Sequence, residues 1–98
     1  MRRDDAIRLL KQAEPDLRAR GVHALALFGS TARGEAGPGS DVDVLVDLDA
    51  SRRFTLIDLS GMRLLMEDRL GQPADLAIRD SLRPAYRVSV EADAIPVF

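Results

Sequence analysis

The first twenty residues have the apolar spacing of an amphipathic helix. On a helix drawn over residues 4–20, one side carries Ile7, Leu10 and Leu17. Pro15 interrupts this helix, because proline lacks the backbone N–H that an interior helical residue donates. We therefore predict a helix that kinks or restarts at Pro15 and ends at Gly21.

Two apolar runs separated by a turn-rich loop predict neighbouring strands. Residues 24–28 are apolar without interruption and stop at Gly29, which is typical of a central strand covered on both sides. The Gly-Pro-Gly-Ser sequence at residues 37–40 is a strong turn signal, and a second strand is expected from Asp41 onwards. Residues 30–36 can form a short helix within the loop between these strands.

The longest predicted helix covers residues 54–70 and carries two apolar stripes where one would suffice. At about 100° per residue, the first stripe consists of Leu59, Met62, Met66 and Leu70. The second consists of Ile57, Gly61, Leu64 and Leu65. A helix that lies on a sheet buries only one stripe, so the second must meet another helix of this chain or another protein.

A third strand and a last helix follow the turn Gly71-Gln72-Pro73. Residues 74–78 are expected to form the strand, with Asp75 on the opposite face from its apolar residues. These apolar residues are Ala74, Leu76 and Ile78. A helix is predicted over residues 82–92, and residues 95–98 form a short extended tail.

Composition limits the classes of protein that the chain can form. With 98 residues, 46% hydrophobic and 31% charged, it suits a single globular domain over residues 1–98. The absence of cysteine excludes disulfides, thiolate zinc sites and cysteine nucleophiles. No apolar run approaches the roughly 18 residues of a membrane span, and we expect a cytoplasmic protein. The net charge of −2 disfavours a general nucleic-acid-binding protein, which needs a basic face.

The candidate chemistry lies in Gly29-Ser30, ten further residues, and then Asp41-Val42-Asp43. Because side chains alternate along a strand, Asp41 and Asp43 leave from one face and the valines from the other. Two carboxylates held so close repel each other unless a hard divalent cation such as Mg²⁺ lies between them and a nucleotide's phosphates. The pattern therefore predicts a site for metal and phosphate, which Asp75 could join from the third strand.

This combination resembles the signature of the minimal nucleotidyltransferases (MNT), members of the DNA polymerase β-like superfamily. The resemblance rests on Phe28-Gly29-Ser30-Thr31-Ala32-Arg33-Gly34-Glu35-Ala36, on Ser40-Asp41-Val42-Asp43-Val44-Leu45-Val46 and on the third acid in Ala74-Asp75-Leu76. It covers nearly the whole chain. We expect an α/β fold in which a mixed sheet of three to four strands has helices packed on one side.

The resemblance also implies how these residues act. Asp41 and Asp43 would hold two Mg²⁺ ions, and Asp75 would ligate one of them and favour deprotonation of an acceptor hydroxyl. Gly29 would let the backbone approach the phosphates of ATP, to which Ser30 offers amides and a hydroxyl. The product would be an acceptor that carries AMP.

Each of these residues also has a purely structural interpretation. The acidic pair could be solvated carboxylates of a turn and strand, and Asp75 an exposed strand residue. Ser30 could be an ordinary helix N-cap, a role that is compatible with phosphate contact. For Arg33, an ion pair with Glu35 or an aspartate is as well supported as a contact with phosphate.

Three functions are compatible with these residues. Many proteins of the resembled family are antitoxins that attach AMP to a tyrosine of a HEPN-domain ribonuclease toxin, which makes such a toxin the expected partner. A binding-only antitoxin would mask the toxin without chemistry, but it would not require the three aspartates. The third is a nucleotidyltransferase that acts on a small molecule, which the lack of an acceptor-recognition domain disfavours.

Overall fold

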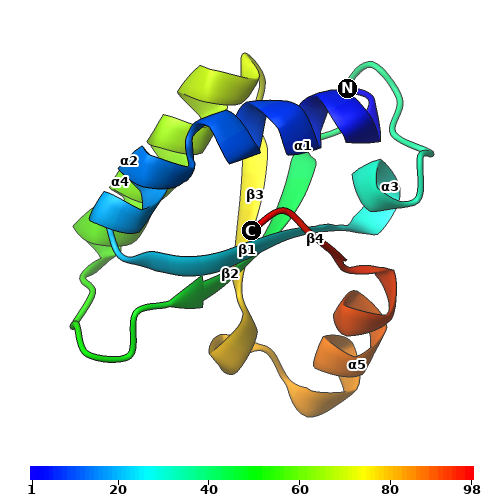
Figure 1. Ribbon diagram of the computed structural model, residues 1–98. Helices are drawn as coiled ribbons and strands as arrows, with labels where there is room; N and C mark the ends of the chain where they lie inside the picture. Colours follow the sequence, from blue (N-terminus) through cyan, green and yellow to red (C-terminus); the bar gives the residue numbers. More distant parts are fainter.

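The computed structural model describes all residues from Met1 to Phe98, and its helices surround a four-stranded sheet (Figure 1). The helices are α1 (Arg3–Gln12), α2 (Glu14–Ala19), α3 (Gly29–Ala32), α4 (Leu56–Leu70), the 3-10 helix η1 (Arg79–Ser81) and α5 (Pro84–Asp93). The strands are β1 (Val22–Phe28), β2 (Val42–Leu48), β3 (Ala74–Ile78) and β4 (Ile95–Pro96).

The sheet is mixed, with strand order β3-β2-β1-β4. β1 is antiparallel to both β2 and β4, whereas β2 and β3 are parallel and are joined through α4. In this register Phe28 lies beside Asp43, and Asp43 lies beside Asp75. The predicted α/β fold with a mixed sheet is confirmed, and the end of β1 meets the first residues of β2 and β3.

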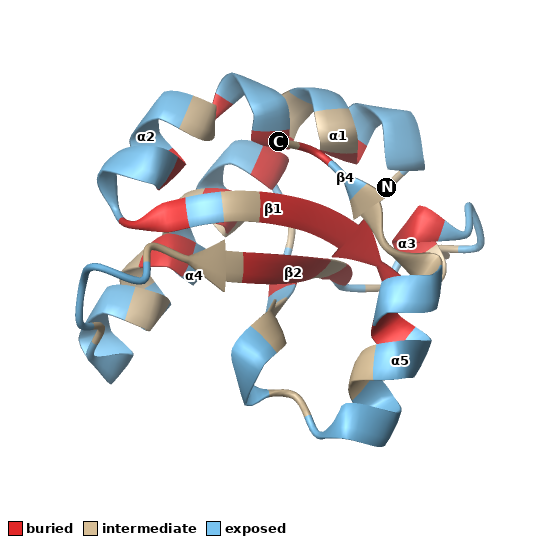
Figure 2. Cartoon of the chain, turned by 60° about the horizontal axis from the view of Figure 1, so that its bottom comes forward, coloured by how far each residue is buried: buried red, intermediate tan, exposed pale blue.

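The main core lies between one face of the sheet and helices α1, α2 and α4 (Figure 2). From β2 it contains Val42, Val44 and Val46, whose side chains have no exposed surface. From the helices it contains Leu10, Leu17, Met62 and Met66. Burial of each large apolar side chain contributes about 1.5–3 kcal/mol, so this face holds β2 in place and fixes which of its residues point away.

Helix α5 departs from the expectation that all helices pack on one side of the sheet. Its residue Val90 is buried on the opposite face, in a second core with Ala26, Phe28 and Leu45. Leu45 is two residues after Asp43 and shares its face of β2. The apolar sequence of β1 indicates cover on both sides, but the sequence of α5 does not say which side it takes. As a result, α5 covers part of the face from which Asp43 projects.

Local signals account for most of the helix boundaries. Helix α1 ends at Gln12, and α2 begins two residues later with Pro15 in its first turn. The predicted restart at Pro15 is therefore observed. Helix α3 is shorter than the segment expected over residues 30–36. The reason is Gly34, whose φ of 74° cannot continue a right-handed helix.

The two stripes of α4 meet different surroundings. Met62, Met66 and Leu70 of the first stripe are buried, as the spacing predicted. In the second stripe, Leu65 is half-buried against the core, but Ile57 is 83% exposed and Leu64 is 59% exposed. With Leu56, which is 82% exposed, they form an apolar surface that no helix of this chain covers. We call Leu56, Ile57 and Leu64 the α4 patch.

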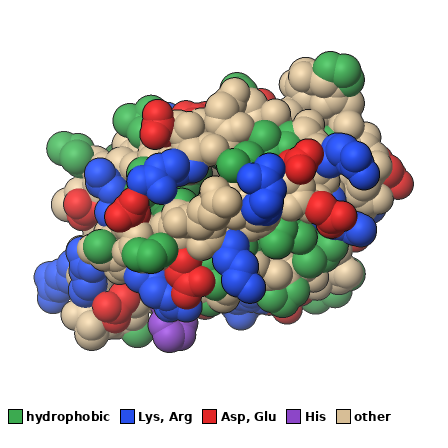
Figure 3. Space-filling model, turned by 45° about the horizontal axis from the view of Figure 1, so that its top comes forward, with side chains coloured by type: hydrophobic (Ala, Val, Ile, Leu, Met, Phe, Trp, Pro, Cys, Tyr) green, Lys and Arg blue, Asp and Glu red, His purple; other side chains and the backbone are tan.

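Charged side chains of both signs are interspersed over the side of the molecule seen in Figure 3. This distribution agrees with the net charge of −2 and gives that side no broad basic area for a nucleic acid. None of the helices combines the length and the apolar character of a membrane-spanning segment.

Candidate functional site

A cleft of about 340 Å³ opens where β1 ends and β2 begins. One wall consists of Phe28, Gly29, Ser30, Arg33 and Asp43. The other wall consists of Tyr86, Ser89, Val90 and Asp93, all from α5. These positions recur three or four residues apart, so one side of α5 faces the glycine-serine turn across the cleft. Four of the six predicted site residues therefore lie in one wall of one cleft.

Gly29 places the backbone directly against the Asp43 carboxylate. Its φ of 67° lies in the left-handed region that favours glycine. A Cβ at this position would overlap Asp43 Oδ2 and lie 3.1 Å from Asp43 Cγ. Only glycine therefore permits both the turn after β1 and the observed position of the carboxylate.

Asp41 and Asp75 flank Asp43 on the sheet, although neither lines the cleft. Asp41 is the residue before β2, and Asp75 is the register partner of Asp43 on β3. Both are exposed, whereas Asp43 is half-buried. Burial raises the pKa of the Asp43 carboxyl, and the negative charges of Asp75 and Asp41 raise this pKa further, against a smaller lowering by Arg33. Asp43 is thus close enough to each of the other two carboxylates to be repelled by it.

The donor chemistry of these carboxylates fits a hard divalent cation, which binds through oxygen ligands. The pKa of Asp43 is raised first by burial and then by the negative charges of Asp75 and Asp41, and a cation would compensate those charges. The side chains do not converge on one point, however, and no group of three or more acidic, histidine or cysteine side chains in the structure is arranged to hold a metal ion. The three aspartates therefore suit a divalent cation in the type of their donor atoms and in their neighbouring positions on the sheet.

Arg33 is held by two carboxylates at the edge of the cleft. Its Nε donates a hydrogen bond to Glu35 Oε2 at 3.1 Å, and its Nη1 donates one to Asp93 Oδ2 at 2.6 Å. The bonds to Glu35 and then Asp93 raise the pKa of the Arg33 guanidinium. The ion-pair alternative for Arg33 is thus observed, and it includes an aspartate of α5.

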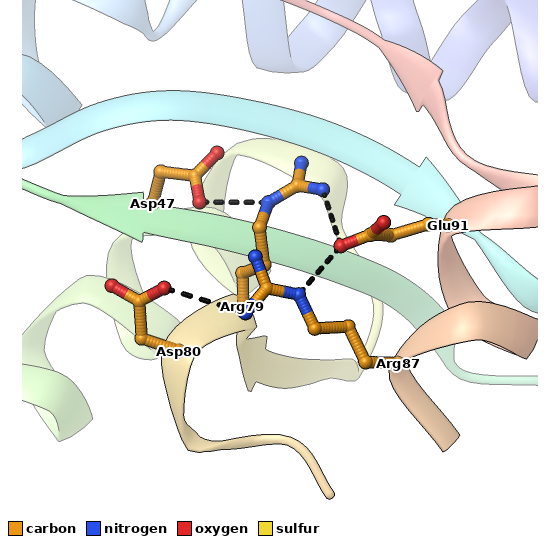
Figure 4. Close-up of polar contacts among 5 residues, drawn as sticks. All are labelled: Asp47, Arg79, Asp80, Arg87 and Glu91. Atoms are coloured by element: carbon orange, nitrogen blue, oxygen red, sulfur yellow. Dashed lines mark hydrogen bonds and ion pairs between the residues drawn. The ribbon is translucent and has the colours of Figure 1, made fainter. Parts of the chain in front are cut away.

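An ion-pair network fixes α5 to the sheet (Figure 4). Arg79 of η1 donates from Nε to Asp47 Oδ1 of β2 at 2.8 Å, and its Nη1 lies 3.1 Å from Glu91 Oε1 of α5. Arg87 donates from Nε to the same Glu91 oxygen at 2.7 Å, and its Nη1 lies 3.8 Å from Asp80 Oδ1. Because Arg79 and Asp47 are only 27% and 30% exposed, water and salt screen their attraction less than that of fully exposed pairs.

The α5 wall could not be identified from the sequence. Tyr86, Ser89 and Asp93 belong to no motif, and their three- and four-residue spacing is shared by any side of any helix. Only the packing of Val90 against the sheet reveals that this side faces the predicted site. Their contribution to the cleft is therefore a finding of the structure.

A second cleft, of about 450 Å³, lies between the N-terminal segment and the loop after α3. It is lined by residues 1–4 and by Gly34, Ala36, Gly37 and Pro38. It contains none of the predicted site residues, and its single carboxylate, Asp4, is paired with Arg3. Although it is larger, it lacks the chemistry of the cleft at Gly29 and Asp43, which remains the candidate site.

Comparison with known proteins gives a consistent result. Residues 9–97 match the family model described as the nucleotidyltransferase domain. The protein adenylyltransferase MntA of Thermococcus cleftensis is 33% identical over 90 residues, which are 91% of this chain and 89% of that protein.

Two solved structures show the same fold. A candidate minimal nucleotidyltransferase has a TM-score of 0.79 and 36% identity, with 98% of this chain and 96% of that chain covered. A complex of a tri-AMPylated Shewanella oneidensis HEPN toxin with an MNT antitoxin contains a chain with a TM-score of 0.66. That match covers 94% of this chain and 71% of the other at 17% identity, so it speaks for the fold alone.

Proposed function

This chain belongs to the nucleotidyltransferase domain family and is an enzyme of that class, and from this premise we propose that it transfers AMP from ATP to a hydroxyl group of a protein. The observation that carries the proposal is the cleft in which Gly29, Ser30, Arg33 and Asp43 lie together. The relative named as a protein adenylyltransferase supports a protein as the acceptor.

In the proposed reaction, the acceptor oxygen forms a bond to the α-phosphorus of ATP. The bond from that phosphorus to the oxygen that bridges to the β-phosphorus breaks, and pyrophosphate leaves with the electron pair. Asp75 accepts the hydroxyl proton, a role that suits an exposed carboxylate at the end of the parallel strand pair. The acceptor then carries AMP as a phosphodiester.

Asp41, Asp43 and Asp75 are the residues that would hold Mg²⁺ in this proposal. When bound, Mg²⁺ neutralises phosphate charge and makes the acceptor hydroxyl more acidic. Asp43 is half-buried and lies directly against Gly29, so its carboxylate would determine where the Mg²⁺ held by all three aspartates lies. Asp41 and Asp75 remain accessible from solvent, where an acceptor protein approaches.

The phosphates of ATP would lie along the turn after β1. Gly29 presents backbone without a Cβ, and the half-buried Ser30 offers its hydroxyl as a donor to phosphate oxygens. Arg33 contributes a guanidinium that exchanges its present carboxylate partners for phosphate oxygens. These groups bind and orient the nucleotide so that its α-phosphorus faces the three aspartates.

The proposed acceptor is a tyrosine of a cognate HEPN-domain toxin, so that the chain acts as its antitoxin. Support comes from the same fold in the MNT antitoxin complex with a tri-AMPylated HEPN toxin and from the α4 patch, which offers apolar contact to a partner. The α4 patch also favours a second candidate function, a binding-only antitoxin, because a surface of this kind needs no chemistry.

Isotopic labelling distinguishes these functions. The chain is incubated with Mg²⁺, a candidate HEPN-domain partner from the same organism, and ATP labelled at either the α- or the γ-phosphorus. Label transferred to the partner from the α position alone supports AMP transfer. Transfer from the γ position would indicate phosphorylation instead, and a stable complex without label would support the binding-only antitoxin.

A further inference from the structure

The α5 wall of the cleft has no task in the proposed transfer step. Val90 anchors it in the second core, and the network through Arg79 and Glu91 ties it to β2. The polar side of α5 therefore stands in a defined position opposite Gly29 and Ser30. A wall that is held by both apolar and ionic contacts is suited to contact a ligand without large rearrangement.

Tyr86 is the exposed aromatic residue of this wall. The three phenylalanines have partners within the protein: Phe28 is buried, Phe54 lies beneath the guanidinium of Arg52, and Phe98 lies beneath that of another arginine, Arg18. Tyr86, in contrast, is 54% exposed and lines the cleft. Its ring is an apolar surface that a flat ligand can cover.

The position of Arg33 in the cleft indicates how a bound nucleotide would be oriented along α5. Arg33 is paired with Asp93 at the C-terminal end of α5, so the cation available to phosphates lies at that end of the wall. Tyr86 is seven positions earlier on the helix, roughly 10 Å along its axis at 1.5 Å per residue. A nucleotide whose phosphates lie at Gly29 and Arg33 therefore directs its nucleoside along α5, past Ser89, towards Tyr86.

We propose that Tyr86 is the stacking surface for the base of the nucleotide, so that α5 forms the nucleoside subsite of the cleft. The inference rests on the proposed function, since it takes the phosphates to lie at Gly29 and Arg33. Aromatic rings stack on the π-face of any base, so Tyr86 adds affinity for a nucleoside without selecting which base is bound.

Tyr86 itself supplies the optical signal for the test. It is the only tyrosine, and the chain contains no tryptophan, so protein emission excited near 280 nm comes from this residue. Titration with Mg²⁺ and an ATP analogue that has a methylene group between its α- and β-phosphorus, which blocks transfer, should quench this emission. Inorganic triphosphate should bind with little quenching, because it has no base. Free N-acetyltyrosinamide corrects for light absorbed by the analogue.

Calorimetry with variants then tests the contribution of the ring to affinity. Tyr86→Ala should weaken binding of the analogue about tenfold or more and leave triphosphate binding within twofold, whereas Tyr86→Phe should keep both affinities. Val88→Ala is the matched control, because Val88 is 71% exposed on α5 and does not line the cleft. It should change neither affinity.

The outcomes separate this inference from the proposed function. Wild-type affinity of Tyr86→Ala for the analogue, or an equal loss for the analogue and triphosphate, would overturn the stacking role and leave the proposed transfer standing. Failure of the unaltered chain to bind either ligand would overturn the proposed function, and the inference with it.

Discussion

The position of the Asp43 carboxylate depends on the absence of a side chain at Gly29. The glycine has a φ of 67°, and the Asp43 carboxylate occupies the space that a Cβ would take. The glycine of the Gly-Ser motif is therefore explained by local geometry, because any larger residue at position 29 must both strain the turn and displace a carboxylate.

We predict that Gly29→Ala abolishes AMP transfer at a cost of about 1–2 kcal/mol in the free energy of unfolding, the strain of an L-residue in the left-handed region. Gly71→Ala is the matched control. Gly71 has a similar φ of 73°, but a Cβ there would meet nothing within 4 Å. Both variants should lose stability in urea unfolding from the shared backbone strain, Gly29→Ala at least as much as Gly71→Ala because its Cβ must also displace the Asp43 carboxylate, and only Gly29→Ala should lose activity. Equal activity of the two variants would contradict the role of Gly29.

The raised pKa of Asp43 predicts a conflict between stability and activity. Folding makes the ionised carboxylate less favourable, so this residue lowers stability at every pH above its folded pKa. The penalty disappears as the pH falls below the ordinary value of about 4, where the carboxyl is protonated in both states. In the presence of a chelator, Asp43→Asn should raise Tm at pH 7 by roughly 2–5 °C. In a separate assay with Mg²⁺ and ATP, the same variant should show no AMP transfer.

Thermal unfolding at several pH values checks this prediction. The difference in Tm between Asp43→Asn and the unaltered chain should be largest at neutral pH and should vanish near pH 3.5. Removal of the chelator and addition of Mg²⁺ should stabilise the unaltered chain more than the variant. A lower Tm for the variant at pH 7 would show that the carboxylate is favourably placed without metal.

Among the secondary-structure elements, α5 is held in its position against the sheet by the ion-pair network around Arg79. Arg79→Gln leaves Asp47 and Glu91 without their shared cation and should lower the free energy of unfolding by about 1 kcal/mol. It should also speed amide exchange in α5 and weaken binding of the ATP analogue, because the second wall of the cleft loosens.

The control for this prediction is Arg3→Gln, which removes a far more exposed pair on α1. Arg3 and Asp4 are 47% and 78% exposed, so their pair contributes little. Hydrogen exchange followed by mass spectrometry should show faster exchange in residues 84–93 for Arg79→Gln only. The same exchange rate in both variants would mean that Val90 alone holds α5.

The elements that the sequence predicted well are those with strong local signals. The β3 strand matches its predicted range because a turn precedes it and its residues alternate between faces, and Pro15 marks the start of α2. The position of α5 was not predictable, because it depends on long-range contacts such as Arg79 with Asp47 and Val90 with β1. The Arg33–Asp93 pair spans sixty residues for the same reason and has no local signature.

For the molecule as a whole, the α4 patch is the feature that folding of this chain leaves unexplained. Ile57→Glu should leave the free energy of unfolding within about 0.5 kcal/mol, since this side chain is already in water. It should weaken the complex with a HEPN-domain partner at least tenfold. Val88→Glu, at a similarly exposed position on α5, is the control and should bind as the unaltered chain does. Unchanged affinity of Ile57→Glu would place the partner elsewhere.

AMP transfer to a protein by the aspartate site would change the intact mass of the proposed HEPN-domain partner, and this mass is the first measurement to make. The partner is weighed after incubation with Mg²⁺, ATP and either the unaltered chain or Asp41→Asn, a variant that keeps the shape of the residue and removes its charge. We expect the partner to gain one or more adenylyl groups with the unaltered chain and none with the variant, although both bind. An unmodified partner in both reactions, or modification by Asp41→Asn, would contradict this expectation.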